Sequence, residues 1–529
     1  MINSIKAPSF FRPTSRPSSP APLAPTPRSD PVERTPRPLT KLSSLSNFRR
    51  PSPAPNPPSL VTPVPLVQDG SYLETLALKL SEAVSKALAQ PIGPSVVNDV
   101  VGGKRPIPTG RGKALGTLIA SELAATRENP HLNRAILRSL QRPLSVLLSN
   151  LSAHLLPVIS SPLFVSPPAP TLQAPNPNPT QLHALALAAF AGEVLEVFDD
   201  LALGLDGDAR GDGLKVIREG LLSIINRVVN PLIAGIRAEM MPLLEALQAP
   251  NSCSALKVAA GAKNTPVQHQ SIAALASVIP VYARALSRYT SSRYAQAALT
   301  PFLISVVWRG LVALASRPYT PPSPPPSPGL PPSMLPKRRR GSASLTPPLT
   351  PPSARFSIKL PPSRPPSPPS VHVPTSTAAD ARTLYELLRS LPRPVDAAST
   401  RLAHEAIDEA FEGLQALAPF LETAQTPEAG HRVSEEELEA LTEELPTLLA
   451  LTVLLNAYGT KSGRSIAQML GLSEEEYRKG CLSGFGRAEE CAGAVGQRIL
   501  DVLRKGEGTP AVVCEWLEAE IADIAQGGN

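Results

Sequence analysis

The stretch SYLETLALKLSEAVSKAL, residues 71–88, carries the pattern that decides the fold of this chain. Its apolar side chains recur every three or four positions and therefore share one face of a helix: Leu73, Leu76, Leu80, Val84 and Leu88. Ser71 and Glu74 have the spacing of a capping box, so we expect this helix to begin near Ser71. Alternation with the period of a β-strand is nearly absent from the sequence.

The same helical period continues along most of the chain. It predicts helices at about 113–127, 130–148, 181–203, 213–247, 266–287 and 291–316, and then at 379–391, 396–424, 434–457, 463–470, 473–481, 484–505 and 510–525. Only 4% of the residues are aromatic, so the core must be built from Leu, Ala, Val and Ile, a composition that favours helix packing. We therefore predict an all-α fold made of two irregular helical units.

Two proline-rich stretches interrupt the helical pattern. Residues 8–65 hold 17 prolines and residues 318–374 hold 21, and neither stretch has enough apolar residues to form a core. We predict long disordered Pro/Ser-rich segments there. The expected organisation is a disordered basic tail at 1–65, a helical domain at 66–317 with a Pro/Asn linker at 166–180 inside it, a disordered basic linker at 318–378, and an acidic helical domain at 379–529. Whether the two helical units pack together stays open.

The net charge of +7 is an average over regions of opposite sign. Residues 318–378 carry seven basic and no acidic side chains, whereas residues 379–529 carry 13 basic and 26 acidic side chains. Opposite charges tethered in one chain attract, so we expect the basic linker to associate weakly with the acidic unit. Phosphorylation of the linker would reverse its charge and release it.

The basic linker also contains the candidate regulatory residues. Four consecutive cations form a candidate nuclear import signal, although a solvated charge run explains them equally well: Lys337, Arg338, Arg339 and Arg340. Several hydroxyl residues precede proline or follow this basic run, as kinase substrates do: Ser323, Ser327, Ser342, Thr346, Thr350 and Ser367. We therefore expect a phosphoprotein that binds kinases, and partner proteins that read the proline-rich linker or the helical surfaces.

Residues 459–480 resemble the helix-turn-helix of bacterial-type DNA-binding domains. Ala467 takes the place of the small residue where the helices cross, and Gly471 that of the left-handed turn residue. Leu472 and Tyr477 take the packing positions of the second helix. Three glutamates, residues 474–476, stand where a DNA reader needs cations or amides, which makes nucleic acid an unfavourable partner. A plain helix hairpin is the alternative interpretation.

A short basic loop suggests another alternative, contact with a membrane surface. Its cations are free of neighbouring acids and could meet a phosphoinositide head group: Lys104, Arg105, Arg111 and Lys113. No apolar run reaches the length of a membrane span, so we expect no transmembrane segment. A solvated loop accounts for these cations as well.

No catalytic, metal-binding or cofactor-binding pattern stands out in the sequence. The four cysteines have no metal-ligand spacing and are too few for a disulfide framework, which favours an intracellular location, in the nucleus, the cytoplasm or both. We expect a non-enzymatic scaffold or adaptor regulated by phosphorylation of its linker. The alternatives are a nuclear DNA-associated regulator that uses residues 459–480 and a peripheral membrane protein.

Overall fold

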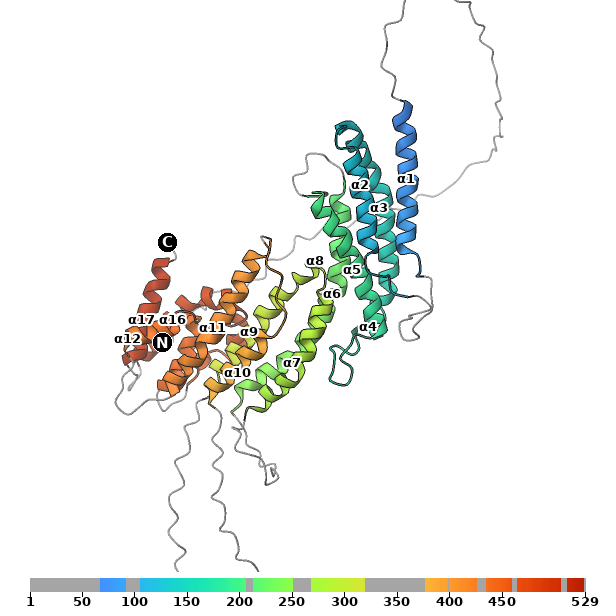
Figure 1. The fold of residues 1–529 in the computed structure, drawn as a ribbon. Coiled ribbons are helices and arrows are strands. Elements are labelled where there is room, and N and C mark those ends of the chain that lie inside the picture. The colour runs from blue at the N-terminus through green and yellow to red at the C-terminus, as the bar shows by residue number, and fades with distance from the viewer. Residues whose placement is uncertain are drawn as a thin grey trace, which may run out of the picture. The chain divides into compact units, whose positions relative to one another are not determined.

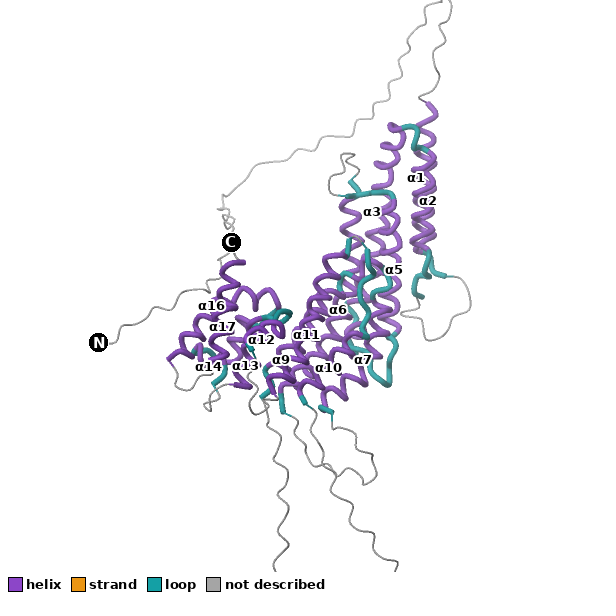
Figure 2. The backbone as a smooth tube through the Cα atoms, turned by 60° about the vertical axis from the view of Figure 1, so that its left-hand side comes forward, coloured by secondary structure: helices purple, strands orange, loops and turns teal. Residues whose placement is uncertain are grey.

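The computed structural model describes residues 67–91, 105–205, 213–250, 268–318, 376–397, 399–425, 434–458, 464–505 and 511–527. These residues form helices and connecting loops, and no strand occurs among them (Figure 1, Figure 2). The prediction of an all-α fold is therefore confirmed.

The helices that precede residue 318 are α1 (Val67–Leu88), α2 (Arg111–Ala125), α3 (Pro130–Ile159), α4 (Pro162–Val165), α5 (Pro179–Asp200), α6 (Lys215–Glu245), the 3-10 helix η2 (Ala246–Gln248), α7 (Gln270–Tyr289), α8 (Arg293–Gln296) and α9 (Leu299–Ala315). Those that follow residue 376 are α10 (Thr377–Arg389), α11 (Arg401–Gln425), α12 (Glu435–Thr442), α13 (Thr447–Tyr458), α14 (Ile466–Leu470), α15 (Glu474–Cys481), α16 (Phe485–Lys505) and α17 (Ala511–Gly527).

Polar caps fix the beginnings of many helices. The side chain of Asn129 accepts a hydrogen bond from the backbone N–H of Leu132 at the start of α3, and Asn178 closes a capping box with Gln181 at the start of α5. Ser434 caps α12, where its hydroxyl oxygen accepts a hydrogen bond from the backbone N–H of Glu437. These caps satisfy backbone N–H groups that would otherwise lack partners.

Several of the expected helix boundaries are wrong: α3 continues to Ile159 instead of ending near residue 148, and the region expected as one helix over 291–316 is divided into α8 and α9. Helix α1 begins at Val67, so Ser71 lies inside the helix and does not cap it. The region expected as one helix over 434–457 is two helices, because α12 ends at Thr442 and α13 begins at Thr447 after Pro446. Pro446 stands at the start of α13, where its carbonyl oxygen accepts from the N–H groups of Leu449 and Ala450 and its lack of an N–H costs no helical hydrogen bond.

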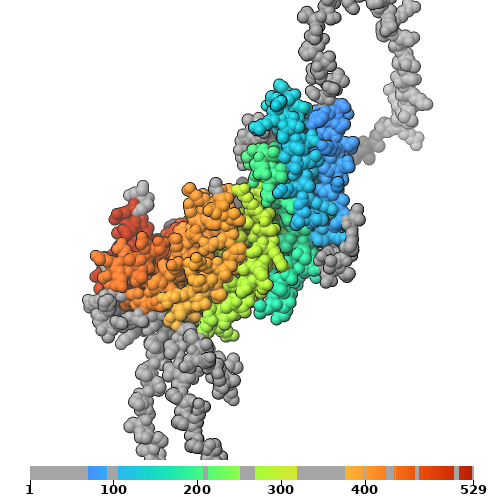
Figure 3. All heavy atoms as spheres, in the orientation of Figure 1, coloured from blue at the N-terminus to red at the C-terminus, as the bar shows by residue number. Residues whose placement is uncertain are grey.

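One continuous core joins the helices on both sides of the proline-rich stretch at 318–374. Helix α5 packs on α2 and α6, α6 packs on α9, and α9 packs on α10, α11 and α13. Helix α13 then contacts α16 and α17. The space-filling view shows the yellow-green and orange parts of the chain in direct contact (Figure 3). The two helical regions therefore pack together, which answers the question that the sequence left open.

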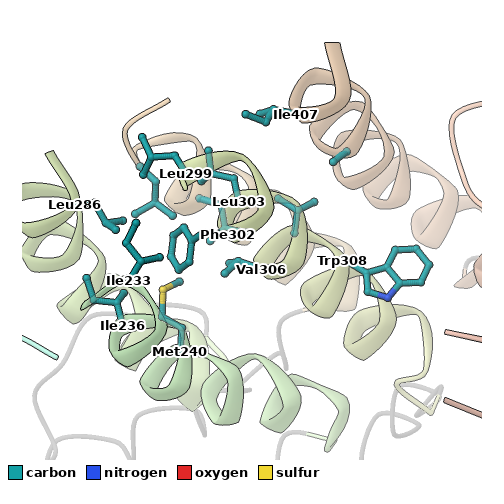
Figure 4. Close-up of a cluster of buried hydrophobic side chains, with 14 of the residues drawn as sticks. Ile233, Ile236, Met240, Leu286, Leu299, Phe302, Leu303, Val306, Trp308 and Ile407 are labelled. Atoms are coloured by element: carbon teal, nitrogen blue, oxygen red, sulfur yellow. The ribbon is translucent and has the colours of Figure 1, made fainter. Parts of the chain in front are cut away.

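Helix α9 lies at the centre of this core. Phe302 and Val306 face Ile236 and Met240 of α6, whereas Trp308 points away from that cluster (Figure 4). Except for Trp308, which is 4% exposed, these side chains are no more than 2% exposed. Burying each large apolar side chain stabilises the fold by roughly 1.5–3 kcal/mol, so α9 links the two helical regions through the hydrophobic effect.

The Pro/Asn segment expected at 166–180 lies against the helical body. It connects α4 to α5, and Asn178 at its end caps α5. A Cβ atom added at Gly235 of α6 would lie 1.8 Å from the carbonyl oxygen of Pro168, so only glycine allows the segment to approach α6 this closely.

Three helical stretches are long and apolar enough, by length and composition, to cross a membrane: Pro179–Asp200, Lys215–Gln248 and Arg293–Ala315. Between 44 and 61% of the most apolar part of each is buried inside this fold. The sequence-based expectation of no transmembrane segment is therefore not confirmed.

Candidate functional site

A buried ion pair joins the end of α9 to the start of α10. Nη1 of Arg317 lies 2.6 Å from Oδ2 of Asp380, and the two side chains are only 5 and 1% exposed. Nε of Arg317 also donates to the carbonyl oxygen of Leu247 in η2, at 2.6 Å. The pair therefore ties together three segments of the chain: η2, the end of α9 and the first turns of α10.

A second polar contact lies at the same place. His269 is the N-cap of α7, where its Nδ1 accepts a hydrogen bond from the backbone N–H of Ser271 at 3.2 Å. The opposite ring nitrogen, Nε2, lies 3.3 Å from the carbonyl oxygen of Ala249 and donates to it. Burial, and then the charge of Arg317, lower the pKa of His269, so the ring is neutral at pH 7. We call His269, Arg317 and Asp380 the polar joint.

The polar joint closes two segments of the chain that lie outside the described residues. The contact of His269 with Ala249 spans residues 251–267, and the ion pair of Arg317 with Asp380 spans residues 319–375. The stretch predicted to be a linker between two domains therefore leaves and re-enters the same buried cluster. Its two described flanks, Arg317 and Asp380, therefore lie side by side.

The pairing of Arg317 with Asp380 does not follow from any sequence pattern. Both residues stand at the borders of the acid-free, proline-rich stretch, and that position was the only signal available. Removing one partner from an ion pair buried to this degree strongly destabilises the fold, because the remaining charge would lie in the core without compensation.

The candidate regulatory residues lie outside the described part of the chain. The import-signal residues Lys337, Arg338, Arg339 and Arg340 fall within the undescribed 319–375 stretch. The same holds for the six hydroxyl residues expected to be phosphorylated: Ser323, Ser327, Ser342, Thr346, Thr350 and Ser367. These assignments stay predictions.

The helix-turn-helix resemblance is retained only in its turn. Ala467 is buried, and Gly471 has the left-handed φ of 73° expected of the turn residue. The N–H of Leu472 donates to the carbonyl oxygen of Ala467, which completes a Schellman motif. Tyr477 is buried as predicted, but Leu472 is 41% exposed and is not a packing residue.

The charge at the start of α15 opposes DNA binding. Glu474, Glu475 and Glu476 form the first turn, capped by Ser473. Hydrogen bonds from the backbone N–H and the hydroxyl of Ser473 lower the pKa of Glu476 and keep it anionic. An exposed anionic turn repels the phosphates of DNA. A capped helix hairpin therefore describes this segment better than a DNA-binding helix-turn-helix.

Of the four cations proposed to meet a phosphoinositide, Arg111 is used inside the fold, and Lys104 lies outside the described residues. The guanidinium of Arg111 donates to the carbonyl oxygens of Ala87 and Ala89 at the end of α1. The backbone N–H groups of Gly110, Gly112 and Lys113 donate to the carboxylate of Glu193. Glu193 therefore occupies the anion-binding end of α2, where a phosphate group would otherwise bind.

The clefts and side-chain clusters of the described residues offer few further candidate binding sites. A charged cleft of about 680 Å³ lies between α6, α9 and α15 and is lined by Glu245, Arg309, Glu474, Glu475, Arg478, Lys479, Leu482 and Ser483. Within the described ranges, no group of three or more His, Cys, Asp or Glu side chains could hold a metal ion.

Comparison with known proteins adds no further constraint. No family model matches this chain, and neither the curated proteins nor the solved structures contain a match.

Proposed function

We propose that this chain is a non-enzymatic scaffold whose helical body holds a basic, proline-rich loop by both ends and presents it to kinases and partner proteins. The observation that carries the proposal is the buried ion pair between Arg317 and Asp380, which joins the two ends of residues 319–375. A buried ion pair at its flanks keeps the two ends of this stretch beside each other, because separating them would leave a charge in the core without its partner.

Closure at the base has a consequence for binding. A segment that only tethers two domains lets them separate, whereas a segment closed on one core keeps all its motifs near one surface. Tethering of this kind holds a motif at an effective concentration on the order of millimolar near any site on that surface. The acidic helices that follow residue 376 are such a surface, because residues 379–529 carry 13 fewer basic than acidic side chains.

Two alternatives have weaker support. The anionic first turn of α15 disfavours a DNA-associated regulator. The internal partners of Arg111 and of the α2 N-terminus disfavour a phosphoinositide site at the basic loop. We therefore place the regulatory chemistry in the proline-rich loop, with an intracellular location in the nucleus, the cytoplasm or both.

A cleavage experiment tests the closed loop. A specific protease site inserted after Ser353 should allow complete cutting, yet the two fragments should still co-elute in size-exclusion chromatography because α9 packs on α10, α11 and α13. Uncut protein with the same insertion is the control. Separation of the fragments under native conditions would show that residues 319–375 connect two independent bodies.

A replacement experiment tests the presenting role. Residues 320–374 are exchanged for a Gly/Ser segment of equal length, which leaves the polar joint and the helical body unchanged. Partners recovered by affinity purification and mass spectrometry should be lost from this variant, and phosphatase treatment of the natural chain should alter the same set. If the Gly/Ser variant retains the partners, the loop is not what they recognise and the proposal fails.

A further inference from the structure

Two cysteines meet where α15 packs against α16. Cys481 is the last residue of α15, and Cys491 lies in the second turn of α16, ten residues later. Sγ of Cys491 lies 3.8 Å from the carbonyl oxygen of Gly480, the residue directly before Cys481, and the two thiols are close enough to influence each other electrostatically. Both cysteines are half-buried, so small molecules can reach them.

The surroundings of this thiol pair are incompletely satisfied. Tyr477, one turn before Cys481 on α15, is 4% exposed, and its hydroxyl has no hydrogen-bond partner among the described residues. The carbonyl oxygen of Gly480 has a second donor, Nε of Arg487 at 2.8 Å. Loss of the S–H donor of Cys491 would therefore leave that carbonyl paired.

We propose that Cys481 and Cys491 form a reversible disulfide when the protein meets a small-molecule disulfide such as glutathione disulfide. One cysteine thiolate attacks a sulfur of the oxidant, so that a mixed disulfide forms and one glutathione thiolate leaves. The second cysteine thiolate then attacks the protein sulfur of the mixed disulfide and expels the second glutathione. The protein loses two electrons and two protons, and the oxidant becomes two molecules of glutathione.

Attack by Cys481 should be slow at neutral pH and faster in alkali. Burial and the neighbouring thiol raise the pKa of Cys481 to about 11, and the nearby guanidinium of Arg487 offsets this only in part. Tyr477 of α15 and Cys491 of α16 also face this thiol. The thiolate is the attacking species, so its low population at pH 7 makes attack by Cys481 slow.

Trp308 of α9 can serve as a fluorescence probe of the disulfide. The indole N–H of Trp308 in α9 donates to the carbonyl oxygen of Leu482 at 2.8 Å, directly after Cys481. Its ring also packs against Phe485 of α16, with 4.6 Å between the ring centroids. A disulfide beside an indole quenches its fluorescence, so this tryptophan reports the state of the pair.

The test uses the full chain with Cys253 and Cys514 replaced by serine, so that only the pair is left. After equilibration in glutathione redox buffers, the remaining thiols are alkylated and the peptides identified by mass spectrometry. We expect a peptide cross-linked through Cys481 and Cys491, and a loss of both alkylation sites that reverses with reductant. Cys491→Ser should abolish the cross-link, with the fold checked by circular dichroism.

A matched control uses Cys514, a half-buried cysteine of α17 that lies near the charged side chains of Arg504 and Glu518. Cys514→Ser in the natural chain should leave the cross-link unchanged. A second readout is the fluorescence of Trp308 in a Trp516→Phe background, which should fall on oxidation and recover on reduction. Glutathione adducts without a cross-link, a cross-link to Cys514 or Cys253, or persistence of both free thiols would overturn the proposal.

Discussion

The polar joint and the α15–α16 contact are two polar clusters inside the same apolar fold, and they differ in how their groups are paired. In the polar joint, charge meets charge: Nε and Nη1 of Arg317 both find oxygen acceptors, and only its Nη2 is buried without a hydrogen-bond partner among the described residues. At the α15–α16 contact, the hydroxyl of Tyr477 is buried without a partner and two thiols lie together. Paired charges are costly to disturb, whereas weakly paired groups can change their chemistry at small cost.

The largest effect is expected from breaking the polar joint. Asp380→Ala leaves the charge of Arg317 buried without a partner and should lower the free energy of unfolding by about 3–5 kcal/mol. Urea denaturation followed by circular dichroism measures the loss. The matched control is Arg401→Ala, whose ion pair with Glu405 is 75 and 56% exposed, and which should change the free energy of unfolding by less than about 1 kcal/mol.

A double variant sharpens this prediction. Arg317→Met combined with Asp380→Leu removes both charges, so no uncompensated charge is left in the core. It should recover most of the stability lost in Asp380→Ala, since apolar side chains often replace a buried pair without loss. If the single and double variants are equally unstable, packing rather than charge accounts for the role of Asp380.

An intermediate effect is expected where the α15–α16 contact meets α9. Trp308→Phe removes the hydrogen bond to the carbonyl oxygen of Leu482 and leaves a small cavity. The free energy of unfolding should fall by roughly 1–2 kcal/mol. Trp308→Tyr is a useful comparison. If Trp308→Phe is as stable as the natural chain, this hydrogen bond contributes nothing to the free energy of unfolding.

A small effect of opposite sign is expected at Tyr477. Because its hydroxyl is buried without a partner among the described residues, Tyr477→Phe removes an unpaired polar group. The free energy of unfolding should rise slightly, by up to about 1 kcal/mol. Thermal unfolding of the two proteins measures it, and a clear loss of stability would reveal a hidden partner for the hydroxyl.

The smallest effect concerns pH and the polar joint. Burial and the charge of Arg317 lower the pKa of His269 in the folded protein below its unfolded value of about 6.5. The unfolded chain therefore binds more protons, so stability should fall as the pH drops through about 6.5 and level off below the folded pKa. His269→Asn keeps an N-cap acceptor but cannot titrate, so its stability should depend less on pH over this window.

Helices could be predicted from the sequence because their determinants are local. The spacing of leucines and the positions of Asn129, Asn178 and Gly471 are sufficient, since each acts within one turn of its own helix. The errors arise where a local signal has a competitor. The helical pattern extends upstream of Ser71 as far as Val67, and the exposure of Leu472 depends on how neighbouring helices pack.

The candidate site was not predictable in the same way. The sequence marks Arg317 and Asp380 as the limits of an acid-free stretch, but 63 positions separate them, and no rule of spacing pairs residues at that distance. The same holds for Glu193, which binds the start of α2 from 81 positions away. The Cys481–Cys491 pair is closer in sequence, yet its contact needs the turn between α15 and α16.

By itself, the sequence determined an all-α chain interrupted by proline-rich stretches, because helical periodicity and proline content act on the backbone locally. Only the tertiary structure decided that the helices on both sides of residues 319–375 share one core, and that a buried ion pair closes that stretch at its base. The physical reason is that burial and charge pairing depend on which surfaces meet in space, and distant side chains reach the same low-dielectric interior only after the helices have packed.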